Sequence, residues 1–356
     1  MSWNLQAGLE PLSALPEELR QAMVGMDQPA YRGDQLFKWL HGRGVLDPLE
    51  MTDLPAQLRE RLAGDGPVCD ARPGQVLRSE DGTRKIEIVL GDGLSVETVL
   101  IPEQNKLTQC VSTQVGCAVG CVFCRSGKLG LARNLSAAEI VAQIHLARGE
   151  LLAGEDLRNV VLMGIGEPLH NLGRVLRALE LMTHPDGLGL SSRRVTVSTV
   201  GVPHGIERLG QATSGDAALA ISLHAADDRV RRELVPGVKA GLGEIVEALG
   251  AYPLPRRRRF TIEYVLVKDL NDSDAQARQL VKLLSTLKVK VNLLPLNPHD
   301  LTDLEPPDDA RIEAFQQILI KKGLTAIVRR RRGADIGAAC GQLLSVLGGA
   351  VLPSSQ

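Results

Sequence analysis

The stretch CAVGCVFC, residues 117–124, places Cys117, Cys121 and Cys124 at spacings of three and then two intervening residues. A zinc site would need a fourth protein ligand, and no second CxxC or histidine pair follows in register. Iron–sulfur clusters usually take four thiolates, so three thiolates indicate a [4Fe-4S] cluster with one iron left open for a cofactor or substrate. A zinc knuckle or a chance grouping of cysteines in a loop is the competing interpretation.

Outward from this stretch, from residue 104 onward, short apolar segments alternate with helical ones. The apolar segments are QCVSTQ, NVVLMG, RVTVST, ALAISLH, TIEYVLV and VKVNLLPL, and the cysteine stretch directly follows the first. Six strand–helix units in series predict an α/β fold, a partial (βα)6 TIM-like barrel with its functional residues at the carboxyl ends of the strands. A last strand, TAIVRRRR, leads into GADIGAACGQLL.

Two further regions precede the barrel. Apolar residues at helical spacing in PAYRGDQLFKWLHGRG and around Leu54, Leu58 and Leu62 predict a small helical N-terminal domain over residues 1–66. The segment KIEIVLGDGLSVETVLIP predicts a β-hairpin that turns at Gly91–Gly93. We therefore divide the chain into 1–66, a hairpin connector at 67–103, and the barrel with its C-terminal cysteine segment at 104–356.

Composition narrows the function classes. The 356 residues carry 41 basic and 42 acidic side chains, for a net charge of -1, so any nucleic-acid surface must be local. Aromatic residues make up 3%, which argues against a face that stacks many bases. There is no signal-peptide pattern and no apolar run of about 20 residues, so we expect a cytoplasmic protein without a membrane partner. In a reducing cytosol its six cysteines favour metal ligation, catalysis or packing over structural disulfides.

Polar and glycine residues follow the other strands. The second strand ends in MGIGEP, where Gly164 and Gly166 allow close approach of a ligand and the carboxylate of Glu167 can accept an ammonium group. A simple turn is the alternative for this motif by itself. The strands that come later contribute Ser198, Thr199, Ser222, His224 and Asn297.

The CxxxCxxC spacing, with Phe123 before the last cysteine, resembles the radical S-adenosylmethionine (SAM) superfamily. The ordered set VETVLIP, QCVSTQVGCAVGCVFC, RNLSAAEI, MGIGEPL, RVTVSTVG, SLHA, PLNP and RGADIGAACGQL resembles the RlmN/Cfr family of RNA adenine methyltransferases over nearly the whole chain. The helical start, with MTDLP, also resembles that family's N-terminal domain.

The resemblance implies two cofactors and a set of roles. Cys117, Cys121 and Cys124 would hold the [4Fe-4S] cluster, and SAM would contact Gly166, Glu167, Ser198, Ser222, Leu223, His224 and Asn297. Cys340 would be methylated by one SAM, and the radical from a second would activate that methyl group to add to adenine. Glu97 would accept the ring proton, and Cys110 would release the product by forming a transient disulfide with Cys340.

Without the resemblance these residues have plainer interpretations. Cys110, Cys340 and Cys69 would be buried small hydrophobes, and Cys69 keeps that interpretation. Glu97 would be a solvent-facing strand carboxylate, and His224 a strand-end histidine in a satisfied hydrogen bond.

The implied reaction is methylation of adenosine C2 in 23S rRNA and in tRNA, with an electron donor such as flavodoxin or ferredoxin, and we expect a monomer. Methylation of C8 of the same rRNA adenosine, as in Cfr, would share every motif. A non-catalytic RNA-binding protein with a structural cluster is the third possibility.

Local basic groups are candidates for RNA contact. Two runs, Arg256–Arg259 and Arg329–Arg332, are expected near the barrel mouth, where they would reach phosphates. Arg32, Lys38 and Arg43 would make the N-terminal domain a second RNA clamp. A solvated charge run is the alternative for each group.

Overall fold

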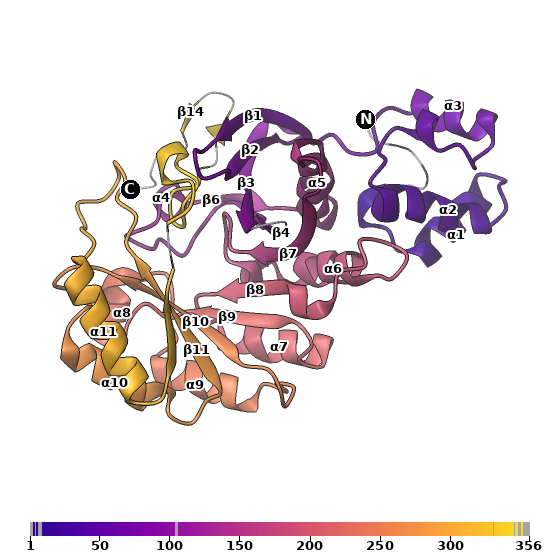
Figure 1. The fold of residues 1–356 in the computed structure, drawn as a ribbon. Coiled ribbons are helices and arrows are strands. Elements are labelled where there is room, and N and C mark those ends of the chain that lie inside the picture. The colour runs from indigo at the N-terminus through magenta and orange to yellow at the C-terminus, as the bar shows by residue number, and fades with distance from the viewer. Residues whose placement is uncertain are drawn as a thin grey trace.

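The computed structural model describes residues 3, 5, 9–103, 106–329, 331–344, 346–347 and 350–351. One large sheet organises the chain in the order β1-β2-β3-β4-β7-β8-β9-β10-β11-β12 (Figure 1). From β4 to β12 every neighbouring pair is parallel. The two end strands of this path, β1 and β12, are not paired with each other, so the predicted partial barrel is confirmed.

The barrel strands are short and mostly buried. They are β4 (Lys106–Cys110), β7 (Asp156–Leu162), β8 (Val195–Thr199), β9 (Ala218–Ser222), β10 (Phe260–Leu266), β11 (Val289–Pro295) and β12 (Thr325–Val328). The helices between them are α4 (Arg125–Lys128), α5 (Ala137–Ala147), α6 (Leu172–Thr183), α7 (Pro203–Thr213), α8 (Asp228–Leu234), α9 (Leu242–Ala251), α10 (Asp274–Leu284) and α11 (Asp309–Lys321). Parallel strands require such crossovers, and the helices cover the outer face of the sheet (Figure 1).

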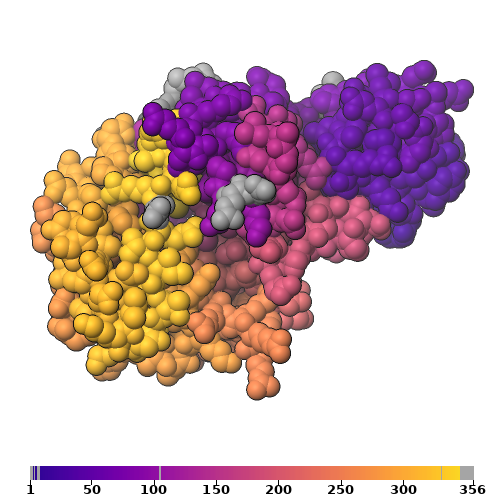
Figure 2. All heavy atoms as spheres, in the orientation of Figure 1, coloured from indigo at the N-terminus to yellow at the C-terminus, as the bar shows by residue number. Residues whose placement is uncertain are grey.

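The N-terminal helices form a lobe beside the barrel (Figure 2). They are α1 (Pro16–Gly25), α2 (Tyr31–Phe37), which continues as a π-helical segment over Lys38–Arg43, and α3 (Ala56–Gly64). Leu36, Leu58 and Leu62 are buried, as their helical spacing predicts. The lobe contacts the barrel through the buried rings of His41 and His145, whose Nδ1 and Nε2 atoms lie 3.3 Å apart.

The predicted hairpin is β2 (Arg84–Val89) with β3 (Leu94–Glu103), and its turn includes Gly93 at φ +83°. Together with β1 (Arg72–Arg78) it continues the barrel sheet, because β3 pairs antiparallel with β4. Near the C-terminus, β13 (Val346–Leu347) pairs with β3 and with β14 (Ala350–Val351). The hairpin thus reaches both the first barrel strand and the C-terminal segment.

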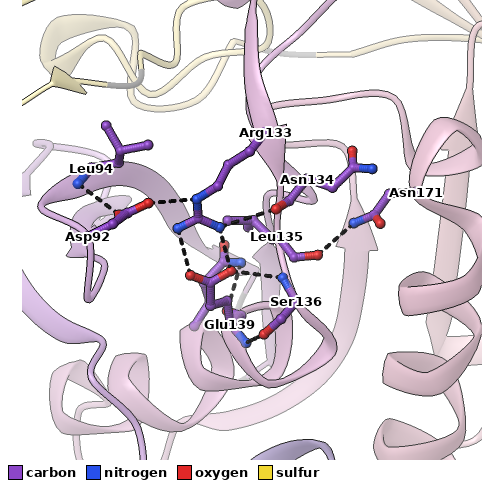
Figure 3. Close-up of polar contacts among 9 residues, drawn as sticks. Asp92, Leu94, Arg133, Asn134, Leu135, Ser136, Glu139 and Asn171 are labelled. Carbon is purple, nitrogen blue, oxygen red and sulfur yellow. Dashed lines mark hydrogen bonds and ion pairs between the residues drawn. The ribbon is translucent and has the colours of Figure 1, made fainter. Parts of the chain in front are cut away.

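Arg133 on β6 (Leu131–Asn134) fastens the hairpin turn to the start of α5 (Figure 3). Its guanidinium lies 2.7 Å from Asp92 in the turn and makes two 2.8 Å hydrogen bonds to Glu139. Glu139 and Ser136 form the capping box expected at this helix start. β6 pairs with β5 (Gln114–Gly116), directly before the cysteine stretch, so this network also supports the cysteine loop.

Among the described residues, no helix has the length and apolar character that a membrane span requires.

Candidate active site

A pocket with about 980 Å³ of empty space, its mouth included, opens at the carboxyl ends of the barrel strands. Its lining includes ten of the residues expected from the sequence: Cys117, Cys121, Cys124, Gly166, Glu167, Ser198, Ser222, His224, Asn297 and Cys340. Leu223, Glu97 and Cys110 are not among the residues that line it. The fold therefore gathers side chains from six separate loops at one place.

The three cysteines lie on the loop between β5 and α4. Burial raises the pKa of all three thiols, and for Cys121 the neighbouring Cys124 and Cys117 raise it further. Buried thiols so close together become thiolates only beside a strong cation, which iron provides. In the described part of the chain, no group of three or more His, Cys, Asp or Glu is compact enough for a single metal ion. Thiolates around a four-iron cubane stand further apart, so the donor set fits a [4Fe-4S] cluster.

Glycines shape the cysteine loop. A Cβ on Gly127 would lie 2.8 Å from the backbone nitrogen of Cys121 and 2.9 Å from its carbonyl oxygen. Real Cβ atoms do not approach so closely, so only glycine lets α4 pack against the loop. The ring of Phe123 packs edge-on against that of His224 with centroids 4.8 Å apart, which joins the loop to the end of β9.

Glu167 is buried at the end of the second predicted strand, β7. One carboxylate oxygen accepts the backbone N–H of Leu169 at 2.9 Å and the other accepts that of Val200 at 2.8 Å. Burial raises the pKa of Glu167 to about 7. The same carboxylate raises the pKa of Cys117 and of Cys121, so it lies close to the cysteines. A carboxylate held beside the open iron position suits an ammonium group there.

His224 sits at φ +59°, in the left-handed region, just after β9. Its Nδ1 accepts the backbone N–H of Val265 at 3.1 Å, so this hydrogen bond assigns the ring proton to Nε2. Burial lowers the pKa of His224 to about 3, and the ring is therefore neutral. The hydroxyl oxygens of Ser198 and Ser222 lie 3.3 Å apart on the adjoining wall.

Arg231 on α8 is a residue that the sequence did not single out. It is 2% exposed and donates to the carbonyl oxygens of Leu223 and Val200. These two residues directly follow the neighbouring strands β9 and β8. Burial lowers its pKa to about 10, and the thiol of Cys121 acts against this shift, so the guanidinium lies near the cysteines. In the sequence DRVRREL it is indistinguishable from the exposed arginines beside it, such as Arg229.

Glu263 in TIEYVLV is another pocket residue that the sequence analysis missed. It is buried, and one of its oxygens accepts from Asn292 Nδ2 at 2.8 Å. A charge within an otherwise apolar strand was the available signal. Its carboxylate raises the pKa of Cys340, and both residues line the pocket.

Cys340 is exposed at the pocket mouth, on the segment that follows the short helix Ala334–Ile336. The segment is tied to the pocket by Asn297 Nδ2, which donates to the carbonyl oxygen of Cys340 at 3.0 Å. Ser126 Oγ donates to the carbonyl oxygen of Leu343 at 2.7 Å. The side-chain oxygen of Asn297 is buried and has no partner among the described atoms, so it can accept a hydrogen bond from a ligand.

Cys110 lies on β4 and is buried, and its thiol is electrostatically coupled to that of Cys340. Burial raises the pKa of both thiols, that of Cys340 to about 11. All six cysteines of the chain are free. The disulfide that the resemblance implies between Cys110 and Cys340 is therefore absent from this structure, because the first thiol is enclosed by the sheet while the second faces the pocket.

Glu97 on β3 is not the solvent-facing carboxylate of the plainer interpretation. Its side chain is 16% exposed and forms an ion pair with Lys85 at 2.9 Å. Burial raises the pKa of Glu97, and Lys85 opposes that shift.

The basic runs lie at opposite ends of the barrel. Arg256–Arg259 directly precede β10, at the amino ends of the strands, so the expectation that this run is near the barrel mouth is wrong. Arg329 follows β12 at the carboxyl end, together with Arg331 and Arg332; Arg330 lies outside the described residues. The first run stands before a strand and the second after one, and the two ends of parallel strands lie at opposite ends of the barrel.

Comparison with known proteins agrees with this geometry. Residues 111–281 match the family model of the radical SAM superfamily, and residues 12–66 match that of the ribosomal RNA large subunit methyltransferase N-terminal domain. A protein of Sorangium cellulosum named dual-specificity RNA methyltransferase RlmN is 49% identical and covers 94% of this chain and 95% of its own. One of the same name from Geobacter sulfurreducens is 44% identical over 92% of this chain and 89% of its own.

A solved structure extends the agreement to the whole fold. The crystal structure of a radical SAM methyltransferase from Sphaerobacter thermophilus superposes with a TM-score of 0.89 at 41% identity. It covers 93% of this chain, which spans 98% of the other. This chain therefore belongs to the RlmN family of radical SAM RNA methyltransferases.

Proposed function

We propose that this protein methylates C2 of adenosine in 23S rRNA and in tRNA, in the cytoplasm and as a monomer, with electrons from a donor such as flavodoxin or ferredoxin. The observation that carries the proposal is the position of Cys340, which lines the same pocket as Cys117, Cys121 and Cys124. The names of the relatives, dual-specificity RNA methyltransferases, support an RNA substrate.

Cys117, Cys121 and Cys124 would hold the cluster, and Gly166, Glu167, Ser198, Ser222, His224 and Asn297, which line the same pocket, would contact SAM. Leu223, between Ser222 and His224, would support that wall. When bound, the cluster supplies the electron that cleaves SAM to a 5'-deoxyadenosyl radical. The protein's own contribution is position and exclusion of water. The neutral His224 and the buried Glu167 are fixed by backbone N–H groups before any ligand arrives, so little reorganisation is needed.

Cys340 carries the methyl group to the base as a covalent intermediate. Glu97 accepts the proton from the ring carbon. The thiolate of Cys110 then attacks the sulfur of Cys340, and a sulfur–sulfur bond forms as the sulfur–carbon bond to the base breaks. The electron pair of the broken bond stays on the carbon, which takes up a proton to become the methyl group, and the methylated base leaves. The electrostatic effect of Cys340 on the pKa of Cys110 supports this role. Because Cys110 is buried, the release step requires Cys340 to turn toward it.

The RNA surface is proposed at the pocket mouth, with Arg329, Arg331 and Arg332 near the substrate loop. The N-terminal cations have partners within the chain: Arg32 donates to the carbonyl oxygen of Asp53, and Lys38 lies 3.5 Å from Asp186. Arg43 stacks on Trp39, with its guanidinium carbon 3.8 Å from the ring centroid. Reversing Arg329 and Arg331 to glutamate should weaken RNA binding and reduce its salt dependence by about one phosphate per residue.

Anaerobic turnover with Cys110→Ala tests the proposal. A protein–RNA adduct joined through Cys340 should accumulate, and mass spectrometry of the wild-type product should match a 2-methyladenosine standard. An 8-methyladenosine product would replace C2 with C8 as the target. Free methylated RNA from Cys110→Ala would overturn the release role, and no 5'-deoxyadenosine from the reconstituted wild type would favour a non-catalytic RNA-binding protein.

A further inference from the structure

The loop that carries Cys340 is held on both sides by one ion pair on strands β2 and β3. Lys85 Nζ lies 2.9 Å from Glu97 Oε1 and donates to the carbonyl oxygen of Gly337 at 3.2 Å. The second oxygen of Glu97 accepts the backbone N–H of Leu344 at 2.8 Å. Gly337 and Leu344 lie on either side of Cys340, so the ion pair closes the loop between them.

Both side chains are largely withdrawn from solvent, with 10% of Lys85 and 16% of Glu97 exposed. An ion pair buried to this degree adds little net stability, because desolvation of the two charges offsets their attraction. Its distinctive effect is geometric. Besides pairing with each other, the ammonium group of Lys85 donates a hydrogen bond to the backbone of the Cys340 loop and the carboxylate of Glu97 accepts one from it.

Backbone contacts at Glu97 on β3 and at Gly337 in the Cys340 loop support the same arrangement. The hydroxyl of Ser112 donates to the carbonyl oxygen of Glu97 at 2.7 Å, which fixes β3 against the start of the cysteine region. Gly337 has φ +62°, and a Cβ there would lie 3.5 Å from Lys85 Nζ. The loop thus passes close over the ammonium group, in a left-handed conformation that glycine adopts without strain.

We propose that Lys85 and Glu97 form a latch that fixes the Cys340 loop, with Lys85 as a positioning residue. The inference rests on the proposed function, in which Cys340 carries the methyl group and Glu97 accepts the ring proton. In the latched state both oxygens of Glu97 are engaged, one with Lys85 and one with Leu344.

The latch couples proton transfer to movement of the loop. When the C–H bond of the base breaks, its electron pair stays on the base and the proton forms an O–H bond on Glu97. The neutral carboxyl loses its ion pair with Lys85 and becomes a weaker acceptor for the N–H of Leu344. The loop is thereby released at the step after which Cys340 must reach the enclosed Cys110.

Strand β2 offers a matched control. Arg84, the neighbour of Lys85, is also buried and also forms an ion pair, 2.7 Å from Glu155. Successive side chains of a strand point to opposite faces, so Arg84 contacts the segment before β7 and does not touch the Cys340 loop. Arg84→Met therefore reports general weakening of the sheet, and Lys85→Met adds loss of the latch.

The test is hydrogen–deuterium exchange of peptides covering 337–344, measured on anaerobically reconstituted full-length protein without RNA. Lys85→Met should exchange there about tenfold faster than wild type, as expected when the charged hydrogen bond from Lys85 to Gly337 is lost. Lys85→Arg, which keeps the charge, should restore most of the protection, and Arg84→Met should leave it unchanged. The alkylation rate of Cys340, followed by peptide mass spectrometry, should change in the same order.

Glu97→Gln tests the coupling, because the amide mimics the neutral carboxyl. Its 337–344 peptides should exchange as fast as those of Lys85→Met, and continued protection in either variant would overturn the latch. Equal exchange in Lys85→Met and Arg84→Met would do the same. None of these readouts needs turnover, so wild type that fails to methylate RNA would refute the proposed function while leaving the latch intact.

Discussion

Arg231→Met removes a buried guanidinium that ties together the loops after two barrel strands. Two carbonyl oxygens, of Val200 and Leu223, lose their charged donor inside the protein. Hydrogen bonds to charged groups contribute about 1.5–3 kcal/mol each, so the gross loss is roughly 3–6 kcal/mol. Relief from burying the charge offsets part of this, and we expect a net loss of about 3 kcal/mol.

The expected loss in the free energy of unfolding can be measured as a decrease in melting temperature. At about 2.1 cal/mol/K per residue, a chain of this length has an unfolding entropy of about 0.75 kcal/mol/K. A loss of about 3 kcal/mol then lowers Tm by about 4 °C. Differential scanning calorimetry of the apoprotein measures this change. SAM binding should weaken as well, because Ser222 and His224 flank the carbonyl oxygen that Arg231 holds.

Arg229→Met is the matched control. Arg229 is on the same helix but exposed, 2.9 Å from Glu233 in an i,i+4 pair that contributes about 0.3–0.5 kcal/mol. Its Tm should change by less than about 1 °C. If Arg231→Met lowers Tm no more than Arg229→Met does, the buried hydrogen bonds do not stabilise these loops as argued.

Two further predictions follow from the packing. Burial lowers the pKa of His41 to about 3 and that of His145 well below its usual value, with Arg148 acting in the same direction on both. Near pH 6.5 each of these histidines takes up a proton in the unfolded chain but stays neutral in the folded chain. The free energy of unfolding therefore falls as the pH falls below 6.5, by about 1.4 kcal/mol per pH unit for each histidine. Tm should therefore fall between pH 7 and pH 5, and His41→Phe with His145→Leu should flatten that fall; an equal fall in the double variant would exclude the pair as its source. Gly127→Ala should reduce the iron bound per chain after reconstitution, because its Cβ would collide with the backbone of Cys121, whereas Gly243→Ala on α9, with nothing within 4 Å, should bind iron like wild type.

Local sequence patterns were enough to predict the strands and the helices between them. The alternation of apolar strands with amphipathic helices predicted the parallel sheet, and the Ser136–Glu139 box marked the start of α5. The position of Arg256–Arg259 was predicted wrongly, because it depends on which end of β10 the run adjoins.

The sequence by itself determined how the three cysteines of the loop are grouped. The spacing of Cys117, Cys121 and Cys124 is a property of a linear motif, and residues so close in a loop remain near one another in any fold. Tertiary structure alone decided what surrounds them. The guanidinium of Arg231 near the cysteines, the exposure of Cys340 beside the enclosed Cys110, and the contact of Lys85 with a loop about 250 residues away arise from sheet order and crossover connections. Contacts between such distant segments leave no local periodicity in the chain, because each is set by where the strands pair.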